Sequence, residues 1–164
     1  MCYGGLRRHW SLRDGKVVEQ VGEEIWSPRH VVRDANNIRV LIYDHGDEVA
    51  TLCEELELRG FDTMRAATGA HALVTAKAWR PDIAVIGTDV VLGDGFATAR
   101  KLRNDDKCWD VAIIAYTSDS AEKVRDSTRQ FEFDAYCQKS RGPGRLMALI
   151  ERLTPPDLPA IPVR

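Results

Sequence analysis

Short apolar runs alternate with amphipathic stretches through the middle of this chain, and this alternation constrains the fold more than any other feature. Because strands and helices that alternate in this way require right-handed crossovers, we expect an α/β fold with helices on both faces of a five-stranded parallel sheet. The strands are expected at 39–43, 61–66, 83–86, 111–116 and 135–138, and the helices at 49–56, 70–79, 96–103, 121–131 and 145–153. The second strand alternates polar and apolar residues, which is typical of an edge strand and favours the order 2-1-3-4-5.

Three regions of the chain differ in composition. Residues 1–37 are densely charged and contain Trp10 and Trp26, so we expect an arm, a short hairpin around Asp14–Gly15, or a helix docked through its tryptophans. Residues 38–153 carry the alternating pattern and are expected to form the folded domain. Residues 154–164 hold four of the seven prolines, a composition that favours an extended tail.

Length and charge exclude several classes of protein. The 164 residues suffice for one domain with extensions, and the longest apolar runs are far shorter than the roughly 18 residues needed to cross a bilayer. A net charge of −2 argues against broad nucleic-acid binding, which needs a basic surface. The four cysteines show no metal or redox spacing, and a cytoplasmic location is the expected default.

Polar residues stand directly after four of the predicted strands. In the order 2-1-3-4-5 a crevice opens at the carboxyl ends of the strands, where α/β proteins place their functional sites. The residues expected there are Asp44–His45, Gly87–Thr88–Asp89, Thr117–Ser118 and Lys139–Ser140.

These fragments, in this order, resemble a bacterial response-regulator receiver domain of the CheY-like superfamily. The resemblance covers residues 38–153 and includes Arg39–Asp44, Pro81–Ile83, Asp94–Phe96 and Asp134–Tyr136. It implies a flavodoxin-like receiver fold. It also implies a pocket in which an aspartate at the end of the third strand accepts a phosphoryl group while acidic residues hold magnesium, an ion that prefers oxygen ligands. Thr117 matches the hydroxyl position, Lys139 the lysine, Tyr136 the aromatic switch and Asp44 one acidic residue.

The departures from the receiver pattern concern the phosphorylation chemistry. His45 stands at the second acidic position and Gly87 at the phosphoacceptor, so the chain is predicted to be a degenerate pseudo-receiver with no catalytic residue. If the strand continues, Asp89 is expected about 6.6 Å further along it than Gly87, which is more than the length of a hydrogen bond. A local bulge or an altered loop would bring Asp89 back, and it is included with the other residues of the degenerate pocket. Magnesium is expected only if Asp89 replaces the missing acceptor, and we expect His45 and Lys139 to pair with Asp44 without a metal.

Two weaker interpretations concern the same pocket residues. Asp44 with His45 and either Asp47 or Asp89 would also suit a transition metal. Tyr136 is more often a packed aromatic than a working switch, since burial explains most aromatics in such positions.

The predicted function is signal transduction through protein–protein contacts, independent of aspartate phosphorylation and without enzyme activity. The resemblance implies a protein partner such as a histidine kinase, another regulator or a second copy, bound at the face formed by the fourth helix, fifth strand and fifth helix. That face would draw on residues 121–131, Tyr136 and residues 145–153. The alternatives are a working receiver that uses Asp89 with magnesium and a flavodoxin-like binder of small molecules. No membrane partner is expected.

Overall fold

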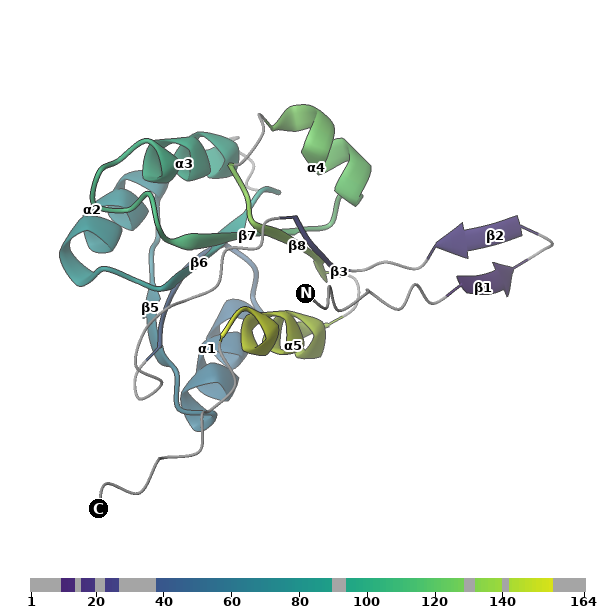
Figure 1. Ribbon diagram of the computed structural model, residues 1–164. Helices are drawn as coiled ribbons and strands as arrows, with labels where there is room; N and C mark the ends of the chain where they lie inside the picture. Colours follow the sequence, from purple (N-terminus) through teal and green to yellow (C-terminus); the bar gives the residue numbers. More distant parts are fainter. Residues whose placement is uncertain are drawn as a thin grey trace, which may run out of the picture.

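The computed structural model describes residues 10–13, 16–19, 23–26, 38–89, 94–128, 132–139 and 142–154, with side chains from residue 24 onward except at residue 94. Most of these residues form one α/β domain (Figure 1). Its strands are β3 (Glu23–Ile25), β4 (Arg39–Tyr43), β5 (Asp62–Arg65), β6 (Ile83–Gly87), β7 (Ala112–Thr117) and β8 (Ala135–Gln138). Its helices are α1 (Val49–Leu58), α2 (Gly69–Trp79), α3 (Asp94–Arg103), α4 (Ala121–Ser127) and α5 (Pro143–Leu153).

The central sheet has six strands in the order β3-β8-β7-β6-β4-β5. The prediction of five parallel strands is therefore corrected, because β3 joins the edge of β8 in antiparallel register and makes the sheet mixed. The strands from β4 to β8 pair with one another in parallel. Strands β6 and β7 are buried on both faces, which explains why their sequences are apolar without alternation.

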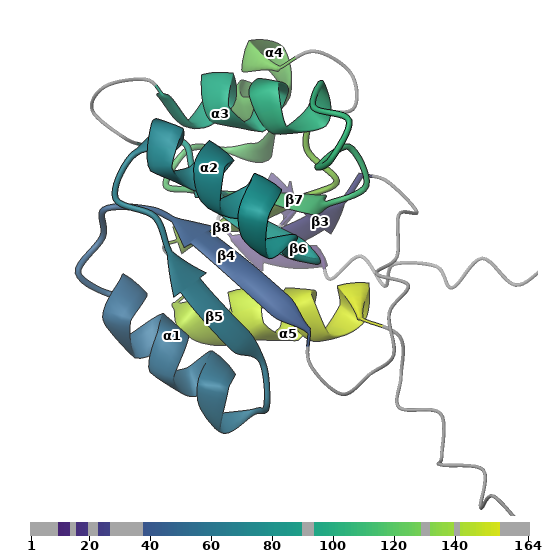
Figure 2. The same ribbon diagram turned by 90° about the vertical axis from the view of Figure 1, so that its left-hand side faces the viewer.

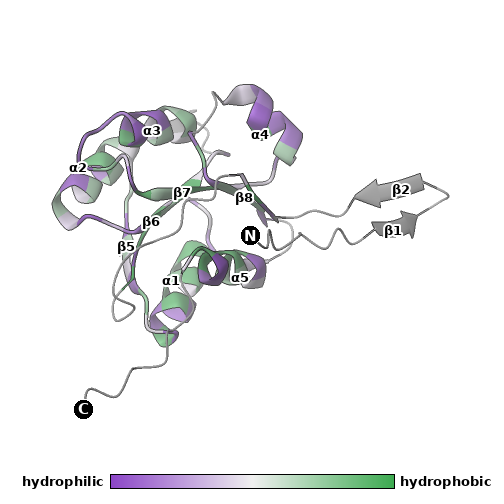
Figure 3. Ribbon diagram, in the orientation of Figure 1, coloured by the Kyte–Doolittle hydropathy of each residue, from purple (hydrophilic) through white to green (hydrophobic). Residues whose placement is uncertain are grey.

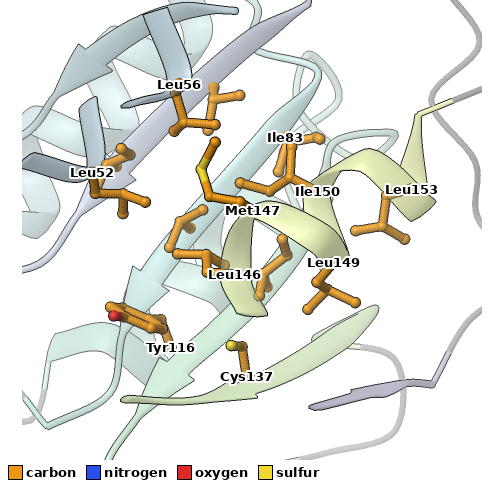
Figure 4. Packing of buried hydrophobic residues seen from close by; sticks show 14 of the residues in the cluster. Leu52, Leu56, Ile83, Tyr116, Cys137, Leu146, Met147, Leu149, Ile150 and Leu153 are labelled. Atoms are coloured by element: carbon orange, nitrogen blue, oxygen red, sulfur yellow. The ribbon is translucent and has the colours of Figure 1, made fainter. Parts of the chain in front are cut away.

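Helices cover both faces of the sheet. Helices α2, α3 and α4 lie on one face and α1 and α5 on the other (Figure 2). Apolar colouring follows the inner strands and the inward sides of the helices (Figure 3). Because successive strand residues point to opposite faces, Val40 and Ile42 join the cluster beneath α1 and α5, whereas Leu41 and Tyr43 join the cluster beneath α2 and α3. Figure 4 shows Leu146, Met147 and Ile150 of α5 within the first cluster.

The helix boundaries differ from the predicted ones mainly in the fourth helix. Helix α4 ends at Ser127, and of the remaining residues predicted to be helical only Thr128 is described, in an extended conformation. Helix α5 begins two residues earlier than predicted, at Pro143, a residue favoured in the first turn of a helix. None of the helices in the described ranges is long and apolar enough to span a membrane.

A second, two-stranded antiparallel sheet consists of β1 (Trp10–Arg13) and β2 (Lys16–Glu19). The predicted Asp14–Gly15 turn between these strands lies outside the described residues, as do the side chain of Trp10 and the tail beyond Thr154. Trp26 is described and packs against the core of the domain, but it follows strand β3 and does not belong to the docked helix that was considered.

Candidate functional site

The candidate pocket lies at the carboxyl edge of the parallel strands. Asp44 directly follows β4, Gly87 ends β6, Thr117 ends β7 and Lys139 directly follows β8. Strand pairing aligns these ends, since Tyr43 is the register partner of Ile86 and Thr117 that of Gln138. The parallel sheet therefore brings together residues that are up to 95 positions apart in the sequence.

The side chain of Asp44 fills the space that a side chain at position 87 would occupy. A methyl carbon added to Gly87 would overlap Oδ1 of Asp44 and lie 2.8 Å from its Cγ. Gly95, in the first turn of α3, packs so closely on the end of β6 that its own added carbon would lie 3.1 Å from the Thr88 Cα. The position predicted for the missing phosphoacceptor is thus filled by another carboxylate.

One ammonium group bridges two carboxylates in the pocket. Lys139 Nζ lies 2.9 Å from Asp44 Oδ1 and 3.2 Å from Asp89 Oδ2. Burial is the largest single influence on the pKa of Lys139 and lowers it, but the hydrogen bonds and charges of the two carboxylates outweigh burial and leave this pKa above its ordinary value. The lysine therefore stays charged and neutralises carboxylates that would otherwise repel each other.

Asp89 lies in the pocket, as the alternative of an altered loop required, and not on a continued strand. Strand β6 ends at Gly87, and the chain then turns so that Asp89 Oδ1 accepts a 2.5 Å hydrogen bond from the Thr117 hydroxyl. Its Oδ2 accepts hydrogen bonds from the Ser118 amide at 2.8 Å and the Ser118 hydroxyl at 3.0 Å. Burial, the largest influence, raises the pKa of Asp89, but these hydrogen bonds and Lys139 together hold it below its usual value.

Hydrogen bonds connect the pocket to Tyr136 on β8. The Asp119 amide donates to Thr117 Oγ1 at 3.1 Å, and the Tyr136 hydroxyl donates to the Asp119 carbonyl oxygen at 2.6 Å. Tyr136 is 1% exposed, and its burial raises its pKa to about 12. The phenol is therefore neutral, points inward and is fixed by the same loop that holds Asp89.

His45 does not take the role predicted for it beside Asp44. Its side chain is exposed, and its ring meets the ring of Tyr43 edge-on at 5.7 Å between centroids. Of the two expected partners of Asp44, only Lys139 forms a hydrogen bond with it. The other carboxylate oxygen, Asp44 Oδ2, is buried without a hydrogen-bond partner.

The described side chains of the pocket surround an ammonium group and do not form a cluster of metal ligands. Within the described ranges, no group of three or more His, Cys, Asp or Glu side chains is placed to hold a metal ion. The cation between Asp44 and Asp89 is the ammonium of Lys139. Asp44 Oδ1 and Asp89 Oδ2 already contact this ammonium, and Gly87 supplies no side-chain oxygen of the kind that magnesium prefers.

Sequence reasoning missed two residues that shape the pocket. Ser118 was named at the crevice without a role, yet its amide and hydroxyl both bind Asp89. Glu48 accepts a 3.1 Å hydrogen bond from the Tyr116 hydroxyl, whose ring lies under Lys139 Nζ at 5.2 Å from its centroid. The only signal for Ser118 was its position next to Thr117, and for Glu48 its position just before α1.

Sequence comparison relates this chain to response regulators, although no family model matches it. It is 26% identical over 98 residues to the DNA-binding dual master transcriptional regulator RpaA of Synechocystis, a stretch covering 59% of this chain and 40% of RpaA. It is 27% identical over 84 residues to the polar-differentiation response regulator DivK of Brucella anthropi, covering 51% and 68% of the two chains. It is 33% identical over 87 residues to the transcriptional regulatory protein PrrA of Mycobacterium tuberculosis, covering 52% and 37%. The matched stretch thus spans well under half of the two transcriptional regulators.

Solved structures show the same fold. The chemotaxis response regulator CheY4 of Vibrio cholerae superposes with a TM-score of 0.64 at 19% identity, covering 71% of this chain and 98% of CheY4. The receiver domain of a sensor histidine kinase from Pseudomonas aeruginosa, which has a magnesium ion coordinated in its active site cleft, gives a TM-score of 0.62 at 22% identity and covers 71% and 97%. Relatives and structures together support a two-component response-regulator receiver (CheY-like) domain.

Proposed function

We propose that this receiver domain works as a pseudo-receiver, which signals through protein–protein contacts and does not depend on aspartate phosphorylation. The observation that carries the proposal is the Asp44 carboxylate in the side-chain space of Gly87. A receiver of the usual pattern would need an acceptor carboxylate at that place, and position 87 offers neither a nucleophile nor the room for one.

The remaining pocket donors support the same proposal, because an internal carboxylate already uses them. The Thr117 hydroxyl, the Ser118 amide and the Lys139 ammonium all contact Asp89. Hydroxyl, backbone amide and ammonium donors of this kind also suit the oxygens of a phosphoryl group. Asp89 therefore supplies from within the chain the negative charge that phosphorylation would bring, and it holds the loop to Tyr136 in one arrangement.

The partner of this module is proposed to be a protein, in keeping with the signalling roles named for its relatives. A histidine kinase, another regulator and a second copy of the chain are the partners that the receiver resemblance implies. The face proposed for them is formed by α4, β8 and α5. Strand β3 pairs with the outer edge of β8 and so lies at this face. Access to this face therefore depends on where residues 23–26 lie.

Intact-mass measurement after incubation with acetyl phosphate and magnesium tests the proposal. The wild-type chain is compared with Asp44→Asn and Asp89→Asn variants, and any adduct is challenged with hydroxylamine, which removes acyl phosphates but leaves acetylated lysines. We expect no hydroxylamine-sensitive adduct on any of the three proteins. A single sensitive adduct that disappears only in Asp89→Asn would overturn the proposal and make the domain a working receiver with a displaced acceptor.

A further inference from the structure

Residues 23–26 complete the edge of the sheet that β8 would otherwise leave open. Glu23, Glu24 and Ile25 pair antiparallel with Cys137, Tyr136 and Ala135, and the Trp26 amide extends the pairing with a 2.7 Å hydrogen bond to the Asp134 carbonyl oxygen. An unpaired strand edge is a ready template for another extended chain. In this structure the template is filled by a segment of the same chain from outside the five-stranded unit (Figure 1).

The segment contributes one large side chain to each side of the sheet. Ile25 packs against the cluster beneath α1 and α5, whereas Trp26 packs against the cluster beneath α2 and α3. Trp26 stacks on Tyr136 with the ring centroids 5.8 Å apart and the planes inclined by 9°. The short strand therefore closes both layers of the core at this edge and lies directly on the tyrosine that is connected to the pocket.

Polar contacts tie the segment to α4. Glu24 Oε2 accepts a 2.6 Å hydrogen bond from the Trp26 indole and also forms an ion pair with Arg125. The Arg125 guanidinium lies 5.0 Å from the centroid of the Trp26 ring. The indole is thus held between a tyrosine ring and a guanidinium, an arrangement that selects an aromatic side chain at this position.

We propose that the edge of β8, with Tyr136 and Arg125, is a binding site for an extended peptide strand, and that residues 23–26 occupy this site in cis. This proposal rests on the proposed function, because it names how the partner face is regulated. The ligand is a strand carrying an acidic residue two positions before an aromatic one, which is the pattern of Glu24 and Trp26. A partner strand with this pattern gains the face only by displacing the internal segment.

The size of the contact fits a segment that can be exchanged. Pairing covers three residues and one further amide, and the ion pair with Arg125 is at the rim, where the arginine side chain is 54% exposed. Exposed ion pairs contribute little. Tethering compensates for this weakness, because a segment on the same chain competes at an effective concentration on the order of millimolar.

A peptide competition experiment tests this proposal on the full chain. A synthetic peptide with the sequence of residues 21–28 is added up to millimolar concentration, and NMR follows its binding to the wild type, to Trp26→Ala and to Trp109→Ala. Trp109 is a matched control, because it is 58% exposed and belongs to neither core cluster. We expect at least tenfold tighter binding to Trp26→Ala than to the other two chains, and loss of that binding when alanine replaces tryptophan in the peptide.

Equal affinity for all three chains, or no binding to Trp26→Ala at millimolar peptide, would overturn the proposal. If Trp26→Ala loses its far-ultraviolet circular dichroism, Glu24→Ala takes its place, since it removes the acceptor that Trp26 and Arg125 share. The result is independent of the phosphorylation test because the peptide assay contains no phosphoryl donor. A phosphorylated Asp89 would refute the pseudo-receiver alone, and a failed peptide competition would refute the strand site alone.

Discussion

Adding one methyl group at Gly87 should destabilise the domain through a single neighbour, Asp44. The added carbon would overlap Oδ1 of Asp44 and lie 2.8 Å from its Cγ, so the carboxylate must leave the position in which it contacts Lys139 at 2.9 Å. Both partners are largely buried, with 3% of the Asp44 and 15% of the Lys139 side chain exposed.

The magnitude follows from two contributions. Overpacking a buried site costs about 1–3 kcal/mol, and breaking a buried ion pair costs about 3–5 kcal/mol when the remaining charge has no other partner. Lys139 keeps its contact with Asp89 at 3.2 Å, which reduces the second contribution. We therefore expect Gly87→Ala to lower the free energy of unfolding by about 2–4 kcal/mol.

A double-mutant cycle measured by urea denaturation isolates the cause. In an Asp44→Ala background the carboxylate is gone and only the Cβ of residue 44 remains, 3.1 Å from the added carbon. The second substitution should then cost about 1 kcal/mol or less, and the coupling energy should be about 1–3 kcal/mol. Gly144→Ala serves as the control, since an added carbon there meets nothing within 4 Å and alanine favours the helix. If Gly87→Ala costs the same with and without Asp44, the reasoning about this pocket is refuted.

Three further substitutions test other parts of the structure by urea denaturation. Asp89→Asn should lower the free energy of unfolding by about 1 kcal/mol at pH 7. Because the pKa of Asp89 is lowered in the folded state, the stabilisation by its carboxylate is present above about pH 4 and should fade as the pH falls further. A difference in stability between wild type and variant that persists unchanged to pH 3 would contradict this. Leu56 has no exposed area, so Leu56→Ala should lower the free energy of unfolding by about 2–5 kcal/mol. Leu58 on the same helix is 88% exposed, so Leu58→Ala should change this free energy by no more than about 0.5 kcal/mol. Similar costs for both substitutions would count against the described orientation of α1. Arg103→Lys should lower the free energy of unfolding by about 1–3 kcal/mol, because the planar guanidinium donates to the Trp109 and Val111 carbonyl oxygens and to Asp134. Arg59→Lys, at an exposed ion pair, is the control. Equal stability of these two variants would show that the planar geometry of the Arg103 guanidinium is unimportant.

The sequence predicted the helices and parallel strands well because their signals are local. The run Ile83–Ile86 is apolar at every position, and this directly reflects burial of β6 on both faces. The sixth strand could not be predicted in the same way. Residues 23–25 have no run of apolar residues, and β3 forms because β8 offers an unpaired edge and Trp26 a partner for Tyr136, both of which depend on tertiary structure.

The candidate site shows the same limit. Strand ends correctly indicated Asp44, Thr117 and Lys139, since strand pairing aligns them. Asp89 was predicted as a pocket residue, but the main prediction continued the strand past Gly87 and displaced it. The chain instead turns there and brings the carboxylate to Thr117. His45 was assigned to the pocket by its place in the sequence, but its exposed ring lies against Tyr43.

The carboxylate of Asp44 in the space beside Gly87 also bears on how the sequence of such a domain can change over generations. An aspartate introduced at position 87 alone would meet a neighbour that already fills its place, so we expect this single substitution to destabilise the domain. Shortening the residue at position 44 first would remove an acidic group that a receiver pocket uses for its ion. Each order of the two changes passes through an impaired intermediate, so we expect a carboxylate at position 87 to be difficult to gain by successive single substitutions.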